Sequence, residues 1–151
     1  MVKSIEVSGT GTDFMNGAIV HSKKETPEGM IRKSTVIIDL KGDLTGKVLY
    51  HVTSTVDSTK GTLVNMGDQV FSGSVAGSDP VMIRDSKFRF EANLKTGEVS
   101  GDVFLLDHLA GPEITCTLHV VGTGKDSDGN PTFRYTGNCT FGTNQSPKVA
   151  R

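Results

Sequence analysis

Hydrophobic and polar residues alternate along almost the whole chain, so that every second side chain is apolar over long segments. The alternation is clearest in residues 34–54, 87–107 and 114–141, and each of these segments can fold into an antiparallel hairpin. Almost no segment repeats with the 3.6-residue period of a helix. The pattern therefore predicts an all-β protein.

Turn positions set the register of the first two hairpins. We place one turn at residues 42–46 and the other at residues 95–98, because both stretches are rich in glycine and polar residues. The predicted opposite pairs are Leu40 with Val48, Ile38 with Tyr50, Val36 with Val52, Leu94 with Val99, Ala92 with Gly101, Phe90 with Val103, and Phe88 with Leu105.

The third hairpin contains both cysteines of the chain. With residues 123–132 as its loop, Cys116 faces Cys139 and Val120 faces Tyr135, and a slip of one residue would turn the apolar set to the wrong face. A disulfide here would close a loop of about 24 residues and stabilise the fold by roughly 3 kcal/mol. In the cytosol the same residues would be two buried thiols, so the sequence predicts the facing and leaves the bond open.

About eight strands with short connections predict one domain over residues 1–151, an eight-stranded antiparallel up-and-down β-barrel. Closure covers the apolar face of the sheet and removes its edges, and a two-sheet β-sandwich is the alternative. Residues 20–30 are expected to form a loop. Residues 142–151 are expected to form a polar, mobile tail.

The balanced charge narrows the choice of partners. Net charge is −1 and no block of basic residues occurs, which argues against nucleic acid and membrane partners because both bind basic surfaces. No apolar run approaches the roughly 20 residues of a membrane span, and the N-terminus lacks the apolar core of a signal peptide. These features favour a cytoplasmic protein, with a mature secreted domain as the alternative.

Metal and cofactor motifs are incomplete. Asp126, Asp128 and Asn130 match the first ligand positions of a calcium loop, but Gly137 stands where the bidentate glutamate belongs. The two cysteines lack the histidine spacing of a zinc site. No glycine pattern opens a helix that could hold a phosphate. We therefore predict no metal and no cofactor.

The predicted inward face of the barrel holds the candidate site. Tyr50 and Tyr135 add hydroxyl groups to an otherwise apolar lumen, and Asp107 is expected near its rim. We take Tyr50, Tyr135 and Asp107 as candidate catalytic residues, for hydrogen bonding or proton transfer. An eight-stranded barrel either fills its interior with side chains or holds one small ligand, and the sequence allows both.

Residues 34–54, with their G-D-L-T-G turn, resemble the allene oxide cyclase barrel group, especially its small bacterial proteins of unknown function. Residues 67–81 resemble the same group, which also includes dirigent proteins. The resemblance covers the middle of the chain, and no catalytic residue of the cyclases can be matched to a position here. It implies an eight-stranded antiparallel barrel, often oligomeric, with a hydrophobic lumen that some members use to steer cyclisation or coupling of reactive small molecules.

Two hypotheses follow. The leading one is a small β-barrel that binds an apolar small molecule in its lumen and that, if it is an enzyme, is a cofactor-free cyclase or isomerase. The other is a non-enzymatic structural or interaction domain with a filled barrel, whose outer face makes contacts such as those of a homo-oligomer. A cavity of roughly 300 Å³ or more would favour the first hypothesis.

Overall fold

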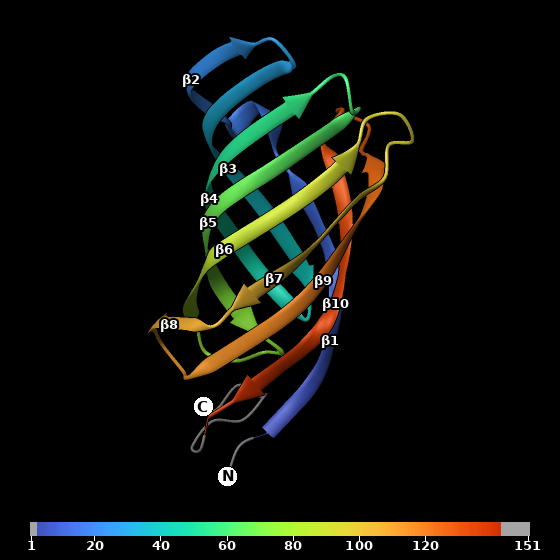
Figure 1. Ribbon diagram of the computed structural model, residues 1–151. Coiled ribbons are helices and arrows are strands. Elements are labelled where there is room, and N and C mark those ends of the chain that lie inside the picture. The colour runs from blue at the N-terminus through green and yellow to red at the C-terminus, as the bar shows by residue number, and fades with distance from the viewer. Residues whose placement is uncertain (1–2, 143–151) are drawn as a thin grey trace.

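The computed structural model describes residues 3–142, and nearly all of them lie in β-strands (Figure 1). A 3₁₀ turn, η1 (Met15–Gly17), joins the first two strands. The strands are β1 (Lys3–Asp13), β2 (Ile19–Thr26), β3 (Gly29–Gly42), β4 (Leu44–Asp57), β5 (Thr62–Val75), β6 (Val81–Asn93), β7 (Val99–Leu105), β8 (Asp107–Ala110), β9 (Ile114–Lys125) and β10 (Pro131–Phe141). Of the predicted tail, all but Gly142 lies outside the described residues.

Eight of the strands form a closed antiparallel barrel. They pair in the order β1, β10, β9, β7, β6, β5, β4, β3, and the pairing of β1 with β3 closes the ring. The two extra strands extend its walls: β2 pairs with β3, and β8 pairs with β6 (Figure 1). The predicted up-and-down barrel is confirmed, and the sandwich alternative is wrong.

The loop predicted at residues 20–30 is wrong, because most of it belongs to the β2–β3 hairpin. Thr26 pairs with Gly29 across a two-residue turn, and its hydroxyl accepts a hydrogen bond from the Gly29 N–H at 3.1 Å. This hairpin projects past the end of the barrel (Figure 1). Its β2 strand is almost wholly exposed and polar, so the strand has no alternation that the sequence could reveal.

The third hairpin has the predicted register, with Val120 opposite Tyr135 and Cys116 opposite Cys139. The two cysteines form a disulfide with their Cα atoms 4.1 Å apart. The interpretation as two free thiols is therefore wrong. In β5, a register shift relative to β6 lies between Gly67 and Gln69.

The registers predicted for the first two hairpins are wrong by two residues. Leu40 pairs with Gly46 and Ala92 pairs with Val99. Because the shift is even, every side chain keeps its predicted face. Polar contacts in the turns explain both shifts.

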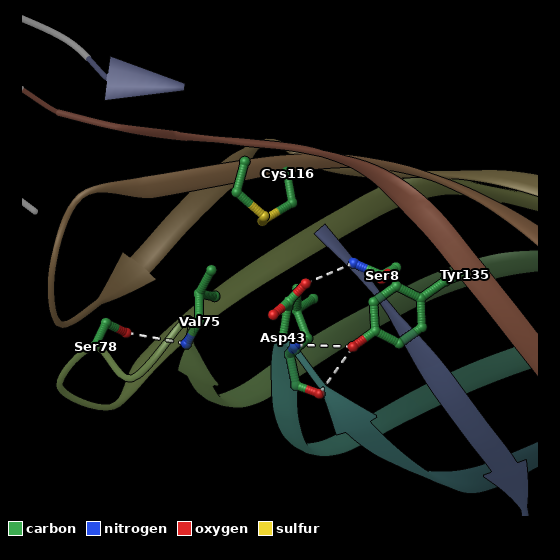
Figure 2. Close-up of a disulfide and its surroundings, with 8 residues drawn as sticks. Ser8, Asp43, Val75, Ser78, Cys116 and Tyr135 are labelled. Carbon is green, nitrogen blue, oxygen red and sulfur yellow. Dashed lines mark hydrogen bonds between the residues drawn. A yellow bond between two sulfur atoms is a disulfide. The ribbon is translucent and has the colours of Figure 1, made fainter. Parts of the chain in front are cut away.

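The β3–β4 turn is short because β1 holds it. The Asp43 N–H donates to the Ser8 carbonyl at 3.1 Å. The Asp43 carboxylate accepts a hydrogen bond from the Ser8 N–H at 2.8 Å, as Figure 2 shows. In the second hairpin, the side chain of Asn93 accepts from the N–H groups of Lys95 and Thr96. Each turn thus begins earlier along the chain than the pattern of apolar residues indicates.

A buried carboxylate replaces part of the predicted β6–β7 pairing. The backbone pairing of β6 with β7 covers only residues 89–92 of β6, so Phe88 has no partner in β7. Asp85, which is buried, accepts hydrogen bonds from the Phe104 N–H at 3.0 Å and from the Gln69 side chain at 3.3 Å. The side chain of Asp85 therefore connects β6 to β7 in the region where the two strands have no backbone pairing.

One end of the barrel is packed solid. Its filling consists of the disulfide and fully buried apolar side chains: Leu44, Phe71, Val75, Val81, Ile83, Ile114 and Phe141. Figure 2 shows this end, where the Tyr135 hydroxyl reaches the β3–β4 turn beside Asp43. These side chains therefore close the barrel at this end.

Glycines on β1 make room for aromatic rings from β10. A Cβ atom on Gly11 would lie 2.2 Å from the Phe133 ring, and one on Gly9 would lie 2.3 Å from the Tyr135 hydroxyl oxygen. Both separations are far below van der Waals contact. The two rings therefore cross the interior over a strand that has no side chains at those positions.

Candidate functional site

The remaining interior of the barrel is a cavity of about 420 Å³. Its lining begins above the packed end, at Leu40 and Val48, and continues to Gly97 and Lys125, which are exposed. Because the lining runs from buried to exposed residues, the cavity opens at the end opposite the disulfide. The volume exceeds the roughly 300 Å³ typical of the smallest ligand sites.

The two halves of the cavity wall differ in polarity. The lining from β6, β7, β9 and β10 is apolar except for Tyr135 and the rim residues Lys125 and Thr132. The opposite half, from β1, β3, β4 and β5, contributes the remaining polar side chains: Asp13, Arg32, Ser34, Tyr50, Ser54, Asn65 and Gln69. We call this set the polar wall. A cavity with one polar and one apolar wall suits a ligand with a polar edge and an apolar body.

The polar wall follows from the alternation of the strands. Arg32, Ser34 and Val36 point inward from β3, because every second residue faces the lumen. Arg32 pairs with Ser54 of β4, and Ser54 pairs with Asn65 of β5. Three polar side chains therefore lie side by side on neighbouring strands near the open end.

Four buried polar atoms of the described residues have no hydrogen-bond partner, and all four belong to the polar wall. They are Asp13 Oδ1, Arg32 Nε, Ser34 Oγ and Asn65 Oδ1. An unpaired buried polar group typically costs about 1–3 kcal/mol, and native proteins contain few of them. All four of these atoms therefore lie in one cavity, and they give the polar wall hydrogen-bonding capacity that the described side chains do not use.

Asp13 carries the most perturbed carboxyl group of the site. Burial raises its pKa to about 6, although the neighbouring Tyr50 hydroxyl, as a hydrogen-bond donor, and the positive charge of Arg32 lower it. The pKa of Tyr50 is also raised, by its burial first and by the Asp13 charge second. The Tyr50 hydroxyl therefore stays protonated at neutral pH and can act as a hydrogen-bond donor, while the Asp13 carboxyl group titrates near pH 6.

Aromatic rings form much of the apolar wall. The Phe88 ring lies 4.7 Å from the Phe90 ring and 4.9 Å from the Tyr50 ring, measured between centroids. Phe133 adds a further ring from β10. Tyr50 thus belongs to both walls, since its ring contacts Phe88 and its hydroxyl lies beside Asp13.

The β9–β10 loop is fastened to η1 at the open end. The Asn130 side chain accepts a hydrogen bond from the Met15 N–H at 3.1 Å, and Met15 itself lines the cavity. The Asp126 carboxylate accepts from the N–H groups of Asp128 and Asn130, both at 2.9 Å. The loop that resembles a calcium motif therefore uses its first acidic residue to hold its own turn.

Within residues 3–142, no three histidine, cysteine or acidic side chains come together as a metal site would require. The same range contains no helix with the length and apolar character needed to cross a membrane.

The three residues predicted as the site occupy different places. Tyr50 lines the cavity as predicted. Tyr135 also lines it, but its hydroxyl accepts from the Leu44 N–H and donates to the Lys41 carbonyl, both at 2.8 Å. Asp107 is exposed on β8 and is not part of the lining. The structure thus brings the two tyrosines into one cavity and leaves Asp107 outside.

Sequence reasoning missed the carboxylate and the guanidinium of the site, Asp13 and Arg32. Arg32 and Ser34 share the inward alternation of Val36, which would have placed them in the lumen if the strand had been extended toward its beginning. Asp13 follows Gly9 and Gly11 at the same spacing. Because those two positions have no side chains, the apolar pattern of β1 ends before Asp13.

The chain matches no protein-family model, no curated protein and no solved structure in the three comparisons made.

Proposed function

We propose that the protein binds an apolar small molecule with a polar edge in the lumen of the barrel. The single observation that supports this most strongly is the coincidence of the unpaired buried polar atoms with the open cavity. A bound molecule would pair the polar atoms of Asp13, Arg32, Ser34 and Asn65 and would cover the rings of the opposite wall. Burial of that apolar area would supply most of the affinity.

The alternative of a filled barrel is less well supported. A filled barrel would pack both ends as it packs the end with the disulfide, and it would pair its inward polar groups. Here only one end is packed. The homo-oligomer implied by the resemblance to the allene oxide cyclase group remains a prediction.

Binding can be tested with N-phenyl-1-naphthylamine, an uncharged apolar probe whose fluorescence rises in apolar surroundings. We expect saturable binding to the purified protein. Ser54→Phe places a ring in the lumen and should abolish binding, whereas Thr55→Phe places the same ring on the exposed outer face of β4 and should leave it unchanged. Equal binding by both variants, each shown to be folded by its melting temperature, would contradict the proposal.

A second candidate function is cofactor-free isomerisation, which is favoured by the location of the Asp13 carboxyl group near the Tyr50 hydroxyl in the cavity. The Asp13 carboxylate would take a proton from a carbon next to a carbonyl group and return it to another carbon of the same molecule. The Tyr50 hydroxyl would donate a hydrogen bond to the carbonyl oxygen as negative charge develops there. No other reactant is needed, because the substrate loses and regains one proton.

The isomerase hypothesis can be checked with 3-cyclohexen-1-one, whose conversion to the conjugated ketone is followed by absorbance. We expect turnover that Asp13→Asn abolishes and Tyr50→Phe reduces. Asp107→Asn serves as the control for a carboxylate outside the cavity. Turnover that survives Asp13→Asn would contradict the role of Asp13.

A further inference from the structure

The guanidinium of Arg32 is the unpaired cation of the cavity. Its Nε is buried without a hydrogen-bond partner, and within the described residues it forms no ion pair. Asp13 lies close enough for the Arg32 charge to influence its carboxyl group, yet the two side chains make no direct contact of ion-pair length. Both groups are therefore available to a third, bound group.

The other charged or titratable groups around Asp13 are few. Tyr50 faces it from β4 and Arg32 faces it from β3. The inward side chains of the strands that flank β1 are uncharged near it: Ile38 and Leu40 on β3, and Phe133 and Tyr135 on β10. In the rest of the lining, Lys125 is the remaining charged side chain, and it lies exposed at the rim.

These surroundings distinguish an anionic ligand from a neutral one. A guanidinium offers parallel N–H donors that match the oxygens of a carboxylate or a similar anion. An anion placed against Arg32 would also bring negative charge close to Asp13 in a cavity of low dielectric constant. Because a nearby negative charge disfavours the ionised form of a carboxyl group, the bound anion would raise the pKa of Asp13, and Asp13 would take up a proton.

We propose that the lumen selects an apolar molecule bearing one anionic group, which pairs with the Arg32 guanidinium while Asp13 takes up a proton from solvent. The inference rests on the proposed binding function and adds the charge of the ligand and the proton that accompanies it. The Ser34 hydroxyl, buried on the same strand as Arg32 and without a partner, donates a hydrogen bond to the same anion. The apolar body of the ligand then lies against Phe88, Phe90 and Phe133.

Two fluorescent probes of the same skeleton separate this inference from simple apolar binding. N-phenyl-1-naphthylamine is uncharged, and 1-anilinonaphthalene-8-sulfonate adds a sulfonate that stays ionised throughout the experiment. The quantity measured is the ratio of the two dissociation constants between pH 5 and pH 8.5. Because only the protein titrates, a change in the ratio reports the charge preference of the cavity.

The wild-type protein should prefer the sulfonate at low pH and lose that preference as the pH rises above about 6, where free Asp13 becomes ionised. The change should reach roughly tenfold for each unit by which the anion raises the pKa of Asp13. In Asp13→Asn the ratio should stay at its low-pH value. Calorimetric titration in two buffers of different ionisation enthalpy should show proton uptake with the sulfonate near pH 7, and none in Asp13→Asn.

Arg32→Gln should weaken binding of the sulfonate roughly tenfold or more beyond any effect that it has on binding of the uncharged probe, because only the sulfonate loses a charged hydrogen-bond partner. Lys33→Gln removes a neighbouring cation from the exposed side of β3 and is the matched control. The inference would be overturned if the ratio of the two dissociation constants did not change with pH. It would also be overturned if Arg32→Gln and Lys33→Gln weakened sulfonate binding equally. Neither result would contradict the proposed function, provided that the uncharged probe still binds. If the wild-type protein binds neither probe, that result would instead contradict the proposed function.

Discussion

At the scale of single residues, the most unusual feature is a carboxyl group that the fold buries without full compensation. The pKa of Asp13 is about 6 in the folded protein and 3.8 in its ordinary state. Between these two values the folded state binds more protons than the unfolded state, so stability falls as the pH rises through this window. One pKa unit corresponds to roughly 1.4 kcal/mol, and the cost above pH 6 is therefore on the order of 2–3 kcal/mol before solvent screening.

Asp13→Asn should consequently stabilise the protein. We expect the free energy of unfolding at pH 7.5 to rise by about 1–2 kcal/mol, because an uncompensated charge leaves the lumen, and the gain should vanish near pH 4. Denaturant titrations at both pH values measure this. Asp39→Asn, which removes a carboxylate paired with Lys47 on the outer surface, should produce no gain; an equal gain in both variants would contradict the account of Asp13.

The two tyrosines of the lumen should behave differently when each is replaced by phenylalanine. Tyr135→Phe leaves the Leu44 N–H and the Lys41 carbonyl without their partner, so unfolding should become easier by about 1–3 kcal/mol. Tyr50→Phe removes a hydroxyl that faces the cavity and should alter probe binding more than stability. Thermal unfolding and probe titration of both variants measure the difference, and the reverse pattern would show that Tyr135 rather than Tyr50 belongs to the binding site.

At the scale of strands and hairpins, alternation determines which face a residue occupies but not its partner. The register of the third hairpin was predicted correctly over residues 114–122 and 133–141, where apolar residues alternate in both strands. Its loop is shorter than the predicted residues 123–132, because the strands continue to Lys125 and from Pro131 past a register shift between Thr132 and Phe133. In the other two hairpins, side chains of Asp43 and Asn93 bind backbone groups and shorten the turns. Such contacts depend on neighbouring strands or on turn geometry, and the period of the sequence contains no information about them.

The disulfide joins β9 and β10 at the packed end of the barrel. Reduction, or the double variant Cys116→Ser with Cys139→Ser, should lower the free energy of unfolding by roughly 2–4 kcal/mol, since the bond restricts a loop in the unfolded chain whose ends are separated by 23 positions in the sequence. Probe binding should persist in the folded fraction, because neither cysteine lines the cavity. Unfolding curves with and without reductant test this, and identical curves would contradict a contribution of the bond.

At the scale of the whole molecule, the two ends of the barrel differ in how their interiors are packed. The end with the disulfide is packed by apolar side chains, whereas the interior toward the opposite end is a cavity that contains the four unpaired polar atoms. The sequence predicted the closed barrel and the apolar part of the lumen. Apart from Tyr50, it did not predict the polar wall, because the polar residues of β1, β3, β4 and β5 come together only when these strands lie side by side in the closed sheet.

The central claim is that the lumen is a binding site and not a core. The most direct test is a crystal structure of the protein with N-phenyl-1-naphthylamine. We predict density for the probe between the rings of Phe88, Phe90 and Phe133 and the polar wall around Asp13 and Arg32. A lumen filled by its own side chains, with Asp13 and Arg32 paired to each other and no probe inside, would contradict the account.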